Sequence, residues 1–135
     1  MKRRSFLKSA LAVAPLAAYS QSAKADTSKR AIRVAAGDDR FGEHLKLGGV
    51  SPNDCKVSSK DTNGVMCIFE SGGVGKGGPP THFHHDQDEW FYVMEGTYAF
   101  QVGSEKFQLK PGDCVLAPRK LPHVWTHVGD GAGKM

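Results

Sequence analysis

Residues 82–89 of this chain are rich in histidine and carboxylate side chains, the types that bind metals. His82 and His84 are two residues apart, and Glu89 follows after a short polar stretch. In an extended segment side chains alternate between faces, so both imidazoles would project to the same side. Residues 90–94 are apolar and rich in aromatics, which is typical of a strand. Two imidazoles and a carboxylate brought to one point by a strand, a bend and a strand suit a divalent transition metal.

A second stretch supplies a fourth ligand. Residues 112–118 read as a turn and a short strand, and 119–122 read as a second turn. A further short strand over 123–127 begins with His123. We therefore expect one metal ion to be bound by His82, His84, Glu89 and His123.

The other histidines fit such a site less well. His85 has the opposite parity to its neighbours and becomes a ligand only if the strand slips by one residue. His127 shares the parity of His123 but lies about 13 Å further along an extended strand, at ~3.3 Å per residue. We expect it to line the pocket without sharing the ion. His44 has no ligand-type partner nearby in the sequence and is read as structural.

The two stretches resemble the paired motifs of the cupin superfamily, and the resemblance covers most of the chain after residue 64. The positions that fit the family spacing are His82, His84, Glu89 and Gly96 in the first motif, and Gly112, Pro118 and His123 in the second. Three positions depart from it: Lys76 and Lys120 replace glycines, and His127 replaces an asparagine. Two motifs with four ligands at family spacing are a specific signal.

The fold expected from the strand pattern agrees with this resemblance. Short strands separated by Gly/Pro turns, with no helical period after residue 25, predict an all-β sandwich or barrel. The resemblance narrows this to a cupin jelly-roll β-barrel with the metal inside. Strand candidates include 31–36, 65–69, 97–102 and 106–110. The segment 65–69 is apolar on both faces and is expected to be central.

The end of the chain carries a further expectation. Cupin barrels generally have at least one more strand after the second motif, whereas this sequence stops shortly after it. We therefore expect a barrel lacking its last strand, which is either a truncated product or an open sheet edge completed by a second copy in a homodimer.

The ligand set leaves the metal and the reaction open. Mixed N/O ligation suits Mn, Fe, Co, Ni, Cu or Zn. The resemblance to quercetin-dioxygenase-like cupins implies a dioxygenase or related oxidoreductase acting on a small flavonol-like or dicarbonyl molecule, with Glu89 as ligand and catalytic base. A metal-dependent isomerase or lyase on a sugar or keto acid is the alternative, and a non-catalytic cupin that binds metal or a small molecule is the third.

The first 25 residues form a separate unit. A basic start, a short apolar run and a small-residue site before Asp26 predict a signal peptide over 1–25, cleaved after Ala25. Its paired arginines resemble a twin-arginine signal, which implies export to a bacterial periplasm. The apolar run is shorter than the ~20 residues of a membrane span, so no stable membrane anchor is expected. A lead-in with a first strand (26–36) and a cupin domain (37–135) would follow.

Removing that unit changes the charge of the chain. Of 18 basic residues five lie in 1–25, which leaves 13 against 14 acidic residues, a net charge of −1. The basic excess therefore belongs to the leader, and no nucleic-acid partner is expected. Of the three cysteines, Cys55, Cys67 and Cys114, two could form one bridge in an oxidising compartment. Cys114 is expected to be a small buried hydrophobe.

Overall fold

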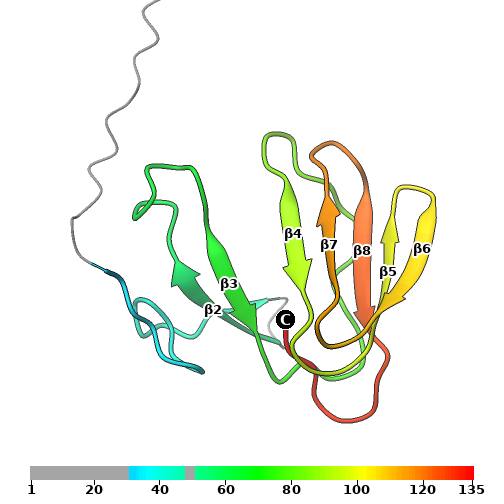
Figure 1. The fold of residues 1–135 in the computed structure, drawn as a ribbon, viewed down its shortest axis with the longest axis horizontal. Helices are drawn as coiled ribbons and strands as arrows, with labels where there is room; N and C mark the ends of the chain where they lie inside the picture. The colour runs from blue at the N-terminus through cyan, green and yellow to red at the C-terminus, as the bar shows by residue number, and fades with distance from the viewer. Residues whose placement is uncertain (1–30, 48–50) are drawn as a thin grey trace, which may run out of the picture.

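A computed structural model describes residues 31–47 and 51–135, and all the regular elements there are strands (Figure 1). The predicted signal peptide and residues 26–30 of the predicted lead-in lie outside these residues. The described strands are β1 (Lys46–Leu47), β2 (Ser51–Val57), β3 (Ile68–Ser71), β4 (Glu89–Tyr92), β5 (Tyr98–Val102), β6 (Glu105–Leu109), β7 (Cys114–Ala117) and β8 (His123–His127). All strand pairs are antiparallel, in the orders β1-β2-β3, β4-β7 and β6-β5-β8. The all-β prediction is confirmed, and none of the described residues forms a helix able to cross a membrane.

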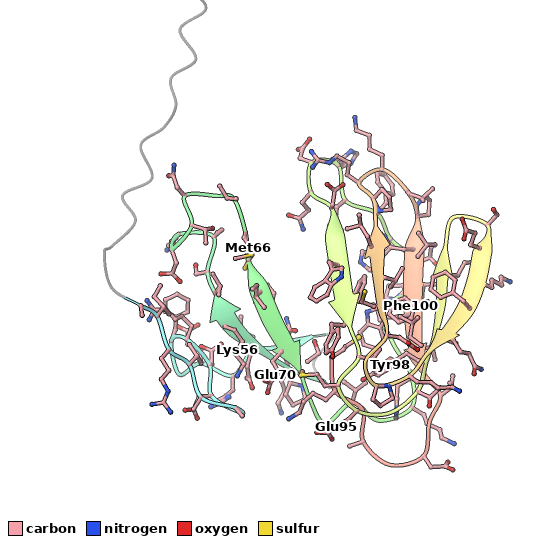
Figure 2. The ribbon with its side chains drawn as sticks, in the orientation of Figure 1. Lys56, Met66, Glu70, Glu95, Tyr98 and Phe100 are labelled. Carbon is pink, nitrogen blue, oxygen red and sulfur yellow. The ribbon has the colours of Figure 1, made fainter. Side chains whose placement is uncertain are left out.

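The core is built on the pairing of β5 with β8. Three cross-strand pairs have both side chains buried: Tyr98 with His127, Phe100 with Trp125, and Val102 with His123. Alternation along both strands places these pairs in successive layers on one face of the sheet. Tyr98 and Phe100 are labelled in Figure 2, where they project from β5 toward the strands beside it. His123 thereby belongs to the same packed face as the aromatic core.

The hairpin predicted between residues 98 and 110 is confirmed. Val102 pairs with Glu105, so the turn contains two residues, Gly103 and Ser104. Gly103 has φ of 57°, in the left-handed region that such turns require and that glycine adopts readily.

Two strand predictions are wrong. Residues 31–36 form no strand: this part of the chain is held by side chains, with the Lys56 Nζ donating to the Ala35 carbonyl at 3.1 Å. The segment 65–69 is not central, because β3 is the outer strand of its sheet and Val65, Ile68 and Phe69 are exposed. An apolar pattern shows which side chains could be buried, but it does not supply the neighbour that would cover them.

The prediction that Cys114 is a buried side chain is also wrong. Along β7 the side chains of Val115 and Ala117 turn inward, whereas Cys114 and Leu116 are exposed. The strand alternation therefore decides against burial, although a lone cysteine is usually buried.

The last residues lie between two parts of the fold. Met135 exchanges backbone hydrogen bonds with Ser71 at 2.8 and 3.0 Å. On the other side Lys134 exchanges bonds with Glu95 at 3.0 Å in each direction. In Figure 1 the C-terminus accordingly lies between the β2–β3 hairpin and β4.

Candidate metal centre

The four predicted ligands meet at one point. One donor atom from each of His82, His84, Glu89 and His123 lies within 4.8 Å of every other. Glu89 is the first residue of β4 and His123 the first residue of β8. His82 lies outside the named strands but forms an isolated antiparallel bridge with His123. The four residues that the sequence singles out therefore come together, although His82 and His84 lie in a bridge and a loop and not in a continuous strand.

Backbone hydrogen bonds join the two motifs directly beneath these side chains. His82 N–H donates to the His123 carbonyl at 3.1 Å, and His123 N–H donates to the His82 carbonyl at 2.8 Å. Lys120 N–H donates to the His84 carbonyl at 2.7 Å. Lys120 has φ of 64°, so the residue that replaces a motif glycine still adopts the left-handed conformation typical of glycine.

Glu89 lies at the centre of the cluster. Its Oε2 is 2.9 Å from His84 Nε2, 3.0 Å from His123 Nε2 and 4.0 Å from His82 Nε2. One carboxylate oxygen thus faces the Nε2 atoms of all three imidazoles.

The outer ring nitrogens of His82 and His123 fix which atom these two imidazoles present. His82 Nδ1 is 2.9 Å from the Pro80 carbonyl, and His123 Nδ1 is 3.1 Å from the Leu121 carbonyl. A carbonyl can only accept, so each Nδ1 carries the hydrogen and a neutral ring presents a bare Nε2 inward. This is the orientation that backbone carbonyls impose on metal-binding histidines.

The inner atoms then need a proton or a cation between them. The bare Nε2 of His123 faces Glu89 Oε2, which is also an acceptor. Two lone-pair-bearing atoms are held at this distance only when a proton or a cation lies between them. Three imidazoles and a carboxylate at such separations fit a divalent transition ion, as the sequence predicts.

The cluster is buried on the side of His123 and exposed to solvent on the side of the other three residues. His123 is only 2% exposed, whereas His82, His84 and Glu89 each have about a third of the side chain exposed. Below, the Phe91 ring lies 6.1 Å from the His123 ring and packs against Phe100 at 5.2 Å. A small molecule could therefore approach from the side of the exposed ligands, over an apolar floor.

An ion pair fastens the rim of the cluster. Arg119 Nε and a terminal guanidinium nitrogen lie 3.0 and 2.8 Å from the two Asp88 oxygens, and Arg119 N–H donates to Asp88 at 2.9 Å. These Arg119 contacts lower the pKa of Asp88 to about 2, the side-chain bond first and the backbone bond second. Sequence reasoning missed this pair, because both residues belong to ordinary polar stretches and only the fold brings them together.

The remaining histidines stay outside the cluster. His85 is exposed and its ring lies 4.9 Å from that of Phe83, so the strand slip that would make it a ligand does not occur. His127 is buried 5.0 Å from the Tyr98 ring, separated from His123 by the Trp125 layer. Neither of its ring nitrogens has a hydrogen-bond partner. His44 Nδ1 lies 3.0 Å from Asp54, far along the chain from the cluster.

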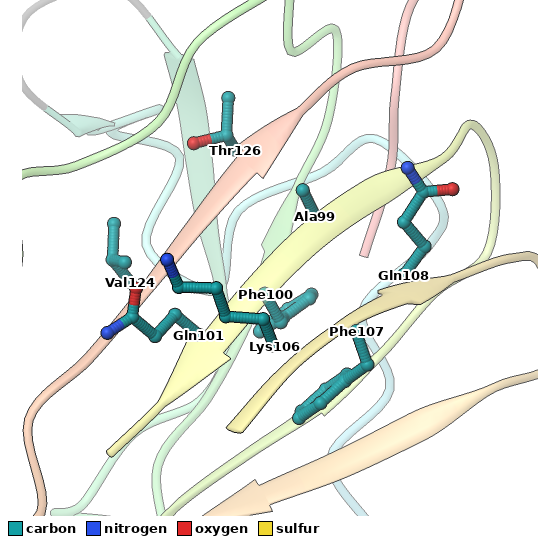
Figure 3. Close-up of a pocket in the computed structure, with 8 residues that line it drawn as sticks. All are labelled: Ala99, Phe100, Gln101, Lys106, Phe107, Gln108, Val124 and Thr126. Atoms are coloured by element: carbon teal, nitrogen blue, oxygen red, sulfur yellow. The ribbon is translucent and has the colours of Figure 1, made fainter. Parts of the chain in front are cut away.

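A hollow of about 450 Å³ lies elsewhere, against the β6-β5-β8 sheet (Figure 3). Its wall includes Gln101, Lys106, Gln108 and Thr126, and none of the four clustered residues. We place the candidate chemistry at the cluster and not in this hollow, because the hollow holds no group of metal-binding side chains.

Comparison with known proteins gives one family match and one curated relative of short overlap. A family model described as a cupin domain matches residues 67–135. An uncharacterized protein of Methanocaldococcus jannaschii is 35% identical over 49 residues, which are 36% of this chain and 39% of that protein. The chain thus spans well under two thirds of this curated relative.

Solved structures share the fold at low sequence identity. The Fe(II) form of HppE has a TM-score of 0.62 and 17% identity, with 79% of this chain and 58% of that one covered. A protein of Thermotoga maritima titled a predicted oxalate decarboxylase has a TM-score of 0.58 and 15% identity, covering 62% and 74%. The cupin domain of Schizosaccharomyces pombe Cnp3 has a TM-score of 0.56 and 12% identity, covering 62% and 56%.

Proposed function

The chain belongs to the cupin family, and from that premise we propose that it is an exported, metal-dependent oxidoreductase of the dioxygenase type. The expected cupin jelly-roll class is confirmed by the family match, the all-β architecture and the structural neighbours. The substrate we propose is a small oxygenated molecule, flavonol-like or a dicarbonyl. The observation that carries the proposal is the open cluster of three imidazoles and Glu89.

The cofactor we propose is a divalent transition metal held by His82, His84, Glu89 and His123. HppE has been described with Fe(II) and with Co(II) bound. This supports iron as the first candidate among Mn, Fe, Ni, Cu and Zn. When bound, such an ion would supply Lewis acidity and, for iron, redox chemistry with dioxygen.

The protein's own groups would position and deprotonate the substrate. The exposed sides of His82 and Glu89 give access, while Phe91 and Phe100 exclude water from below. Glu89 Oε2 is central, so it can take a proton from an enol or phenol that enters the open side.

A second candidate function is a lyase that uses the ion only as a Lewis acid. It is favoured by the likeness to the T. maritima protein, whose title names a decarboxylase. An isomerase acting on a sugar or keto acid belongs to the same class, and a non-catalytic binding cupin is the third candidate.

Export and assembly complete the proposal. The twin-arginine-like start supports delivery of the folded chain to the periplasm. The exposed outer strand β3 supports pairing of two copies at this sheet. We propose neither a nucleic-acid partner nor a stable membrane anchor.

One experiment separates these functions. The full chain is produced in a bacterium with an intact twin-arginine exporter, and the exported fraction is analysed for metal and then for O₂ consumption with a flavonol and a 1,3-dicarbonyl. Stoichiometric metal and O₂ uptake that is absent in Glu89→Gln would support the dioxygenase. Product formation without O₂ uptake would favour the lyase or isomerase, and metal without turnover would favour the binding protein.

A further inference from the structure

Two of the three cysteines lie on the β2–β3 hairpin, away from the metal cluster. Cys55 pairs directly with Phe69, so their side chains lie on one face of the sheet. Cys67 is two residues before Phe69, immediately before β3 begins, and an extended backbone at this point would place its side chain on the same face. The register shift between Cys55 and Val57 occurs at this point of the ladder.

The two thiols interact. Burial first, and then the neighbouring Cys67 thiol, raise the pKa of the Cys55 thiol. Cys55 is 6% exposed, whereas Cys67 is exposed, so the pair has one inner and one outer sulfur.

Contacts on both sides hold the pair in place. Cys55 N–H donates to Asp39 Oδ2 at 2.6 Å, which fixes β2 at this residue. Thr62 Oγ1 accepts from Met66 N–H at 2.9 Å and donates to the Met66 carbonyl at 2.6 Å. These bonds close the loop immediately before Cys67, so the outer thiol is presented by an ordered turn.

We propose that Cys55 and Cys67 form an intramolecular disulfide by exchange with a small disulfide such as glutathione disulfide. The Cys67 thiolate attacks one sulfur of that disulfide and releases one glutathione thiolate. The Cys55 thiolate then attacks the Cys67 sulfur of the mixed disulfide and releases the second. Two electrons pass from the two cysteines to the reagent, and the two protons leave to solvent or to the released thiolates.

The accessibility of the two sulfurs sets this order. Only the exposed Cys67 can meet a dissolved reagent, and the buried Cys55 is the resolving thiol. Cys114 lies on β7, in a different sheet, and remains free. The bridge would tie β2 to the start of β3, whose apolar residues are exposed.

The test uses the full chain, incubated in glutathione disulfide and then denatured and alkylated without reductant. The number of alkylated cysteines should fall from three to one, and the intact mass should fall by two hydrogens before alkylation. Peptide mapping should join Cys55 to Cys67. The apparent Tm should rise by several degrees and return to its original value after reduction.

Matched cysteine variants test which two residues form the disulfide. Cys114→Ser should still form the bridge, so its alkylated cysteines should fall from two to none, whereas Cys67→Ser should form no intramolecular bridge. Cys67→Ser changes an exposed side chain and is expected to fold. Three alkylated cysteines after oxidation, a stable mixed disulfide at Cys67, or a bridge that includes Cys114 would each overturn the proposal.

Discussion

The guanidinium of Arg119 is bound side-on to the carboxylate of Asp88, with nitrogen–oxygen distances of 3.0 and 2.8 Å. Asp88 immediately precedes Glu89, and Arg119 lies in the turn before His123, so the pair flanks two of the proposed ligands. The pair therefore connects the two loops that carry opposite halves of the cluster.

Asp88→Asn should weaken metal binding without abolishing it. Loss of the two-point contact leaves Glu89 and the 119–122 turn less firmly placed, and outer-shell changes of this kind raise the metal Kd by about tenfold or more. Competitive titration with a chelator measures the change. Asp86→Asn removes a neighbouring exposed carboxylate that makes no such contact with Arg119, so it should leave Kd nearly unchanged. Equal effects from both variants would show a general charge effect instead.

The same ion pair should contribute to acid stability. The pKa of Asp88 is lowered to about 2 by Arg119, below the ~3.9 expected in an unfolded chain. Its stabilisation is therefore fully present above about pH 4 and is lost as the pH falls toward about 2. Urea unfolding between these pH values should show a steeper loss in the native chain than in Asp88→Asn. Parallel pH profiles for the two proteins would contradict the assignment.

His84→Ala should abolish stoichiometric metal uptake, because its Nε2 is one of the inward-facing donors. Two histidine variants act as controls: His85→Ala, next in sequence but exposed, and His44→Ala, which pairs with Asp54. Both should bind metal nearly as the native chain does, measured by elemental analysis after dialysis. A similar loss in all three variants would undo the ligand assignment.

Gly96→Ala should destabilise the fold more than Gly112→Ala. Both glycines have positive φ, 85° and 94°. A Cβ at Gly96 would lie 2.7 Å from the buried His127 Nε2, whereas one at Gly112 would meet nothing within 4 Å. The shared backbone cost is roughly 1–2 kcal/mol, and overpacking at Gly96 adds about 1–3 kcal/mol. Chemical denaturation of the two variants measures the difference, and equal losses would show that the His127 contact is unimportant.

The sequence was sufficient to predict which four side chains come together and the two strands that carry Glu89 and His123. Parity and motif spacing brought His82, His84, Glu89 and His123 together, because regular alternation leaves few ways to arrange such residues. The same reasoning located the β5–β6 hairpin through its two-residue turn.

The errors arise where a residue's surroundings come from distant parts of the chain. Apolar content suggested that 65–69 was central, but no described element covers β3. The Asp88–Arg119 pair spans 31 residues and has no local signature. Residues 31–36 have strand-like composition, but a strand also needs a pairing partner, and none of the described segments provides one there.

The bridge between His82 and His123 also affects when a cation can first be captured during biosynthesis. Glu89 and His123 are 34 residues apart, and the long-range His82–His123 bridge and the β5–β8 pairing hold them together in the folded chain. Such distant contacts form slowly, since the loop between them must close first. A ribosome-bound chain ending before position 123 has only three of the four donors, and ion capture should therefore coincide with the last steps of collapse.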